Sequence, residues 1–155
     1  MFKAEPYVTR VAFAASDRPE AQDALKELTA RYGQAPEDQA QAIVALGGDG
    51  FMLETLHRNM GAPKPIYGMN RGSVGFLMNE YSPDGLLDRI NAAERAVIHP
   101  LSMVAVDVRR RQHRALAINE VSLLRQTRQT AKLRITIDDR VRLERDLREA
   151  IGNGL

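Results

Sequence analysis

Short apolar runs alternate with helical spacing in the first part of the chain. Residues 8–15, 42–46 and 65–69 are runs of apolar, partly β-branched side chains, which is typical of strands covered on both faces. Apolar residues then recur every three or four positions over residues 21–32 and 52–60, the spacing of one face of an amphipathic helix. Strands that alternate with helices predict a parallel sheet wound in βαβ units.

The spacing changes near Pro100. A further helix is predicted over residues 83–95, with Ser82 as its cap. Beyond it the chain reads as consecutive β segments without intervening helices, so the βαβ winding ends and an antiparallel module begins. These segments are residues 97–108, residues 116–124, and a hairpin over residues 132–143 that turns at Asp138 and Asp139.

We therefore expect an α/β protein with a Rossmann-like βαβ domain and a parallel sheet, followed by the start of an incomplete all-β antiparallel sandwich domain. The sandwich is expected to be incomplete because it would hold about four strands, whereas two sheets must cover each other's inner faces. The expected division is an α/β nucleotide-binding domain over residues 1–99, the partial sandwich over residues 100–144 and a charged tail over residues 145–155.

One acid stands among three glycines where the second strand meets its helix. Gly47, Gly48 and Gly50 remove the side chains around Asp49. The carboxyl end of a parallel strand is where such sheets bind ligands, and exposed N–H groups at a helix start favour phosphate. A tight turn with Asp49 as the helix cap would account for the same residues. Three glycines exceed what a cap requires, so we interpret the turn as a binding site.

Two further loops are expected at the same edge of the sheet. Ser16 and Asp17 follow the first strand and would border the site, although a capping role is favoured for Asp17. Seven of the eleven glycines lie in residues 47–75, and a ligand held against the backbone would explain their entropic cost. Asn70 ends the third strand and is a candidate ligand contact. Phe76 either packs on a base or begins the next core element.

A polar pair, Asn119 and Glu120, interrupts the apolar segment 116–124. If buried, the pair needs partners, because an unpaired buried polar group costs about 1–3 kcal/mol. On an edge strand the pair would face water, and the residues alone leave both alternatives open. His57 lies on the site helix and could border the pocket. No histidine has metal-ligand spacing, so no direct metal ligand is assigned.

Composition narrows the class of partner. Residues 101–155 hold 12 basic and 7 acidic side chains, in a chain whose formal net charge is +2. Aromatic residues amount to 5% and do not interleave with those arginines, so no nucleic-acid partner is expected. No apolar run approaches the ~20 residues of a membrane span, and no signal peptide is recognised. We expect no membrane partner and a cytoplasmic location.

Three motifs together resemble the NAD kinase family. They are Gly-Gly-Asp-Gly at residues 47–50, Gly-Met-Asn-Arg-Gly-Ser-Val-Gly-Phe-Leu at 68–77 and Ala-Ile-Asn-Glu-Val at 117–121, in the family's order and approximate spacing. The first motif alone is weak, because lipid kinases and phosphofructokinases carry a related turn. The set of three is specific, and the resemblance covers about residues 8–144.

The resemblance implies an enzyme that moves the terminal phosphate of ATP, or of polyphosphate, onto the 2′-hydroxyl of the adenosine ribose of NAD to give NADP. A divalent metal ion, Mg²⁺, would accompany the phosphates. Asp49 would be the catalytic base, although the residues alone fit a carboxylate that holds magnesium equally well. The other implied contacts are Gly48 and Gly50 at the approaching nucleotide, Phe76 at the adenine, and Asn119 with Glu120 at polar groups of the ribose or nicotinamide.

The C-terminal residues depart from the family's pattern. After residue 144 the family continues with another Gly-Asp-Gly and a Thr-Pro-x-Gly-Ser-Thr-Ala-Tyr segment that completes the NAD pocket, whereas residues 145–155 are charged and unlike it. We expect a truncated or frame-shifted product that self-associates as a homo-oligomer and is inactive by itself. The alternatives are an inactive nucleotide-binding module, and a lipid-kinase-like or phosphofructokinase-like fragment.

Overall fold

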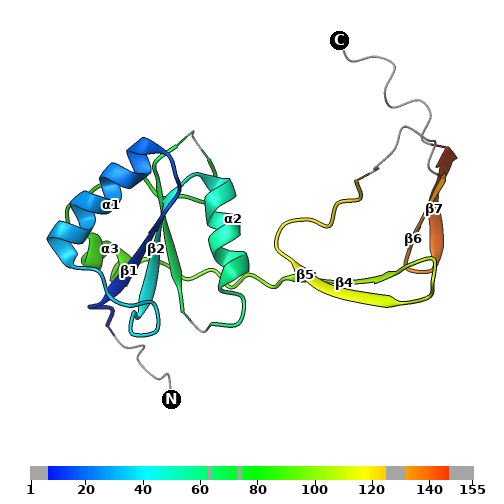
Figure 1. Ribbon diagram of the computed structural model, residues 1–155, viewed down its shortest axis with the longest axis horizontal. Helices are drawn as coiled ribbons and strands as arrows, with labels where there is room; N and C mark the ends of the chain where they lie inside the picture. The colour runs from blue at the N-terminus through cyan, green and yellow to red at the C-terminus, as the bar shows by residue number, and fades with distance from the viewer. Residues whose placement is uncertain (1–6, 63, 73–74, 125–131, 147–155) are drawn as a thin grey trace, which may run out of the picture. The chain divides into compact units, whose positions relative to one another are not determined.

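A computed structural model describes residues 7–62, 64–72, 75–124 and 132–146. The chain divides into two compact units, Met1–Glu120 and Val121–Leu155. The first holds a parallel sheet, three helices and an antiparallel strand pair, and the second holds another antiparallel pair (Figure 1). The expected fold class, a parallel α/β part followed by antiparallel strands, is confirmed. The expected division at residues 99 and 144 stays a prediction.

The parallel sheet has three strands in the order β1-β2-β3. These are β1 (Val11–Ala15), β2 (Ala42–Gly47) and β3 (Ile66–Asn70). All six residues of β2 are buried, as its unbroken apolar run predicts for a central strand. Because Gly47 pairs with Asn70 and Leu46 with Ala15, the three strands end together at one edge.

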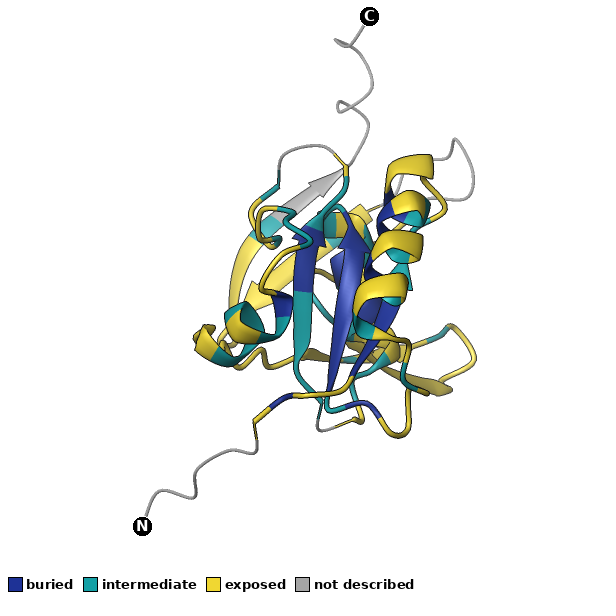
Figure 2. Ribbon diagram, turned by 90° about the vertical axis from the view of Figure 1, so that its left-hand side faces the viewer, coloured by how far each residue is buried: buried dark blue, intermediate teal, exposed yellow. Residues whose placement is uncertain are grey.

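Three helices flank this sheet: α1 (Pro19–Tyr32), α2 (Asp49–Arg58) and α3 (Leu86–Ala92). Their apolar residues face the strands and their polar residues face outward, so that Figure 2 shows buried positions concentrated in the sheet. The core includes Leu28 of α1, Leu86 of α3 and Val44, Leu46 and Met69 of the sheet.

Helices α1 and α2 cover opposite faces of the sheet (Figure 1). Leu28 of α1 packs in the core with Val44 and Leu46. Gly47 points to the other face, where an added Cβ would lie 2.9 Å from Cβ of Phe51 in α2. Since the strands follow in sequence order, helices on opposite faces give the two βαβ crossovers opposite hands. One of them therefore departs from the usual right-handed rule.

The remaining strands form two separate antiparallel pairs. β4 (Leu101–Val106) pairs with β5 (Gln112–Ala117), and β6 (Lys132–Ile137) pairs with β7 (Arg140–Asp146). The predicted turn at Asp138 and Asp139 is confirmed, with φ of 49° and 59° as a type I′ hairpin turn requires. Large apolar side chains of these strands are exposed, namely Leu101, Val104, Val106, Leu116, Ile135, Ile137 and Val141.

Several predicted boundaries are wrong by a few residues. Helix α3 begins at Leu86 and not at residue 83, because Gly85 before it has a left-handed φ of 59°, and Ser82 provides no side-chain cap. The segment 116–124 is not a strand, because β5 ends at Ala117 and Asn119 takes a φ of 81°. Among the described residues, no helix has the length and apolar character needed to cross a membrane.

The caps of the first two helices also differ from the interpretation of the sequence. The residue that caps α1 is Arg18, through its backbone, so neither Ser16 nor Asp17 has that role. Pro19 then occupies the first helical position, where its missing N–H is no loss. Gly48 caps α2, which places Asp49 inside the first turn. The acid is therefore free of the capping role that a tight turn would have given it.

Candidate functional site

The loops after β1, β2 and β3 meet at the carboxyl edge of the sheet. Asp49 is the first residue of α2, directly beyond the buried strand β2. The backbone N–H of Arg71 donates to the carbonyl of Gly47 over 2.7 Å, which ties the loop after β3 to the end of β2. The pairing of Gly47 with Asn70 thus places Asp49 beside the loop that follows β3.

Both carboxylate oxygens of Asp49 accept backbone N–H groups from one further loop. Phe76 N–H donates to Oδ2 over 2.8 Å, and Leu77 N–H donates to Oδ1 over 3.0 Å. Gly75 makes this approach possible, because a Cβ there would lie 2.3 Å from Oδ1 of Asp49. Two backbone donors, one on each oxygen, fix the plane of the carboxyl group.

A cleft of about 450 Å³ opens over this carboxylate. Gly48 and Gly50 face open space, since an added Cβ at either would meet no atom within 4 Å. Oγ of Ser16 is buried at the cleft and has no hydrogen-bond partner among the described residues. The cleft is lined by Ser16, Arg18, Gly48, Asp49, Gly50, Phe51, Glu54 and Gly75.

A second cleft, of about 410 Å³, shares Arg18 with the first. The carboxamide oxygen of Asn70 accepts the N–H of Gly72 over 2.9 Å and shapes the loop at its wall. Arg71 stacks on the ring of Tyr81, with 4.2 Å between guanidinium carbon and ring centroid. The second cleft is lined by Arg18, Glu20, Asn70, Arg71 and Gly72.

Comparison with known proteins identifies the family of this site. The family model described as the ATP-NAD kinase N-terminal domain matches residues 4–94, more than half of the chain and all of the sheet with its helices. The chain belongs to the NAD kinase family. This membership removes the lipid-kinase-like and phosphofructokinase-like alternatives that the Gly-Gly-Asp-Gly turn alone had left open.

Curated NAD kinases from several bacteria are similar to the chain over most of its length. The NAD kinase of Caulobacter vibrioides is 73% identical over 143 residues, which is 92% of this chain and 55% of that protein. Those of Hyphomonas neptunium and Mesorhizobium japonicum are 58% and 55% identical, over 87% and 86% of this chain and 53% and 52% of their own lengths. The chain spans about half the length of these relatives.

The structure gathers some of the expected NAD kinase site residues and leaves others apart. Gly48, Asp49 and Gly50 line the first cleft and Asn70 lines the second. Phe76 donates its N–H to Asp49 while its side chain is 102% exposed, so the ring is not part of the core. Contact between this ring and an adenine stays a prediction.

The three other expected residues do not line either cleft. His57 lies in the last turn of α2, with Nε2 3.4 Å from the carbonyl oxygen of Leu116. Asn119 and Glu120 are exposed and follow the end of β5. Neither alternative weighed for this pair, a buried pair or an edge strand, describes the backbone found there. Their contact with a dinucleotide stays a prediction.

The sequence did not indicate the cations of the clefts or their two glutamates, Glu20 and Glu54. Arg18, Arg71 and Glu54 were not singled out as site residues, although Arg18 follows β1 just as Asp49 follows β2. Glu54 lies one turn after Gly50 and pairs with Arg58 over 2.6 Å. Ser16 was expected to border the site, and it lines the first cleft because β1 and β2 end at the same edge of the sheet.

Proposed function

We propose that the chain forms the nucleotide-binding part of an NAD kinase, which transfers the terminal phosphate of ATP or polyphosphate to the 2′-hydroxyl of the adenosine ribose of NAD. The observation that carries the proposal is the carboxylate of Asp49, held by two backbone N–H groups in a glycine-lined cleft. The NAD kinase relatives support the choice of substrate.

Asp49 has the geometry that a general base needs. Each carboxylate oxygen accepts one backbone N–H, and a second lone pair on each oxygen remains for a substrate hydroxyl. The two donors also restrict rotation of the carboxyl group, so that the group loses less rotational entropy when substrate binds. Such assistance by a positioned base typically contributes 10² to 10⁴ in rate.

Asp49 accepts the proton that the transfer releases. The proton of the ribose 2′-hydroxyl passes to a carboxylate oxygen as the hydroxyl oxygen forms a bond to the terminal phosphorus. The bond from that phosphorus to its bridging oxygen breaks, and ADP or a shortened polyphosphate leaves with the electron pair. Phosphoryl transfer of this kind depends mainly on positioning and on compensation of charge. Gly48 and Gly50 leave room for the nucleotide backbone to approach.

The remaining site residues are proposed as nucleotide contacts. The exposed ring of Phe76 is suited to face the adenine. Asn119 and Glu120 would supply an amide and a carboxylate to the ribose or nicotinamide, and Asn70 would border the phosphates. For His57, the exposed position at the end of α2 favours a role at the margin of the site or none.

A divalent metal ion fits this cleft only as a companion of the phosphates. The described residues contain no group of three or more His, Cys, Asp or Glu side chains that could hold a metal ion. Mg²⁺ commonly binds through one or two carboxylates and substrate phosphates, and Glu54 and Asp49 are the carboxylates that line the cleft. When bound there, the ion would offset the phosphate charge. A cytoplasmic location and a homo-oligomeric state are proposed on the sequence alone.

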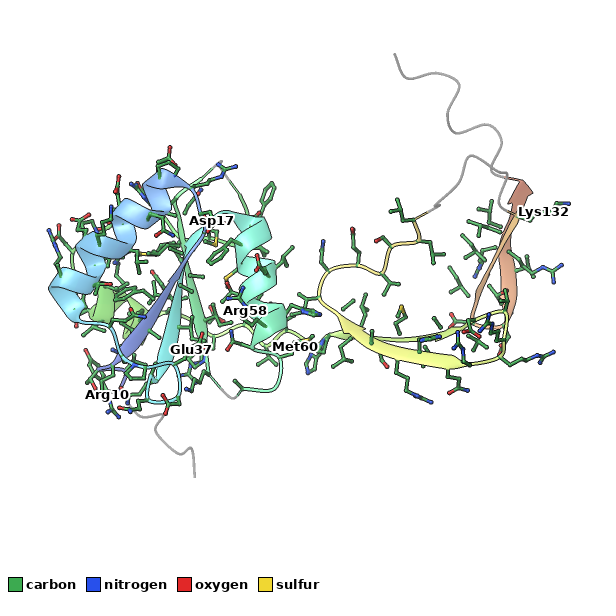
Figure 3. All side chains as sticks on the ribbon, viewed as in Figure 1. Arg10, Asp17, Glu37, Arg58, Met60 and Lys132 are labelled. Atoms are coloured by element: carbon green, nitrogen blue, oxygen red, sulfur yellow. The ribbon has the colours of Figure 1, made fainter. Side chains whose placement is uncertain are left out.

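The proposal is tested by Asp49→Asn in a chain continued with the C-terminal half of the Caulobacter vibrioides relative. The variant should keep its fold and lose NADP formation by at least about a hundredfold, as expected for a lost base. Asp17→Asn is the matched control, since Asp17 is an exposed acid at the same sheet edge (Figure 3). Activity of Asp49→Asn within tenfold of the parent, or a parent that makes no NADP, would contradict the proposal.

A further inference from the structure

The second cleft is bordered by two arginines from different parts of the chain. Arg18 comes from the loop after β1, and Arg71 comes from the loop after β3. No acidic side chain among the described residues pairs with the guanidinium of Arg18, which is exposed to solvent. Glu20 is the acid that lines the same cleft, so the charge of its lining is one unit positive.

Arg71 is held in place before any ligand binds. Its Nε donates to the carbonyl of Glu20 over 3.0 Å, and its guanidinium lies over the ring of Tyr81. The Tyr81 hydroxyl in turn donates to Glu27 over 2.7 Å. A guanidinium fixed on one edge in this way loses little side-chain entropy when its other N–H groups meet an anion.

The two clefts adjoin over a residue without a side chain. A Cβ added at Gly72 would lie 3.4 Å from Nη1 of Arg18 and 3.6 Å from the backbone nitrogen of Gly48. Arg18 therefore stands between the glycine loop at Asp49 and the cleft of Arg71. Because Arg18 lines both clefts, a chain of phosphate groups that runs from Asp49 to Arg71 would pass beside Arg18.

We propose that the cleft of Arg18, Asn70, Arg71 and Gly72 is a subsite for the far end of the phosphate donor, and that it takes a linear oligophosphate anion. The inference rests on the proposed function, because it extends the site of Asp49. Arginine matches phosphate oxygens with two parallel N–H groups, which suits it to successive phosphates on a chain. The carboxylate of Glu20 in the same lining would repel the anion, so binding depends on both arginines.

The experiment measures binding of inorganic tripolyphosphate and of orthophosphate to the 155-residue chain by calorimetry. Tripolyphosphate should bind at least about tenfold more tightly than orthophosphate, because its several phosphate groups can pair with both arginines at once. Arg18→Gln and Arg71→Gln should each weaken the binding of tripolyphosphate by about tenfold and leave the binding of orthophosphate nearly unchanged. Arg71→Lys, which keeps the charge without the planar fork, should also weaken it.

Arg10→Gln is the matched control for charge. Arg10 lies at the opposite end of the sheet from Asp17 (Figure 3), and its side chain forms no hydrogen bond or ion pair with the described residues. Tripolyphosphate affinity should stay within about twofold in this variant. Equal losses in Arg10→Gln and Arg18→Gln would reveal non-specific attraction, and that result, or unchanged affinity in Arg18→Gln, would overturn the proposal.

Binding of NAD, measured in parallel on the chain continued with the C-terminal half of the Caulobacter vibrioides relative, separates this inference from the proposed function. Arginine-dependent binding of tripolyphosphate without any binding of NAD would support the subsite and count against an NAD kinase. If NAD binds and the affinity for tripolyphosphate does not depend on Arg18 or Arg71, the result would support the kinase and refute the subsite. Absence of tripolyphosphate binding to the unchanged chain would also refute it.

Discussion

Phe76 donates its backbone N–H to Oδ2 of Asp49 over 2.8 Å, across 27 positions of sequence. The contact joins the acid at the start of α2 to a loop that follows the third strand. It also explains why glycine precedes Phe76, since the carboxylate occupies the space that a side chain at residue 75 would need. The second motif therefore serves the first, by orienting its carboxylate.

Replacing Gly75 tests this arrangement directly. In Gly75→Ala the new methyl group would overlap the carboxylate, so the Asp49 hydrogen bonds to Phe76 and Leu77 should break. We expect a loss of stability of about 1–3 kcal/mol and a large loss of NAD binding. Gly50→Ala is the control, because its methyl group enters open space and should leave the melting temperature nearly unchanged. Equal melting temperatures for both variants would contradict the arrangement.

Asn119 allows the ligand role of its amide to be separated from its backbone role. Its φ of 81° lies in the left-handed region, which asparagine tolerates and alanine does not. Asn119→Gly keeps that conformation and deletes the amide, whereas Asn119→Ala also adds strain. If the amide holds the dinucleotide, both variants should bind NAD more weakly and only Asn119→Ala should lose about 1 kcal/mol of stability. Unchanged NAD affinity in Asn119→Gly would leave the residue a purely conformational role.

Tyr81 should make stability depend on pH in the alkaline range. Burial, together with the hydrogen bond to Glu27, raises the pKa of the Tyr81 phenol from 10.0 to about 12. As pH rises, the unfolded state therefore loses this proton first. The contribution of Tyr81 is complete below pH 10 and is lost between pH 10 and pH 12.

The measurement compares melting temperatures at pH 9 and pH 11 for the unchanged chain and for Tyr81→Phe. The variant should lose less stability over this interval, because it has no phenol to ionise. Tyr32→Phe is a comparison variant, because it removes another phenol from the same part of the chain. The hydroxyl that it removes donates to the carbonyl of Pro83 over 2.8 Å. Parallel curves for the unchanged chain and Tyr81→Phe would exclude the raised pKa as a source of alkaline sensitivity.

The exposed apolar side chains of the antiparallel pairs predict self-association. Val104, Val106 and Ile137 are 48%, 59% and 51% exposed, and covering such groups is worth about 25 cal/mol per Å². The 155-residue chain should elute as a dimer or larger and should form no NADP, whereas a chain continued with the relatives' remaining half should be monodisperse and active. Light scattering and an NADP assay decide the matter. A monomeric chain that forms NADP would refute the prediction.

The sheet and the acid were predictable because one physical signal dominates there. The run from Ala42 to Leu46 is fully buried, and an uninterrupted apolar run of this length is typical of a strand covered on both faces. Asp49 stands out because three glycines leave it the only side chain with chemistry in the turn. For both, the information lies within a few neighbouring residues.

What could not be predicted depends on contacts between distant residues. The donors to Asp49 are backbone groups of Phe76 and Leu77, which any residue type except proline could supply. Arg18 becomes a cleft residue only because β1 and β2 pair in register and end together. The start of α3 was missed because the left-handed conformation of Gly85 interrupts a pattern that is otherwise helical from residue 83.

The central position of β2 has a consequence for motion at the site. Asp49 follows β2, the central strand, which is hydrogen-bonded to a strand on each side. The backbone that holds Asp49 should therefore open only when the whole sheet unfolds. Phe76 and Leu77 belong to an exposed loop that two hydrogen bonds hold to the acid. In hydrogen exchange the strand would therefore retain its protons longest and the loop would lose them early.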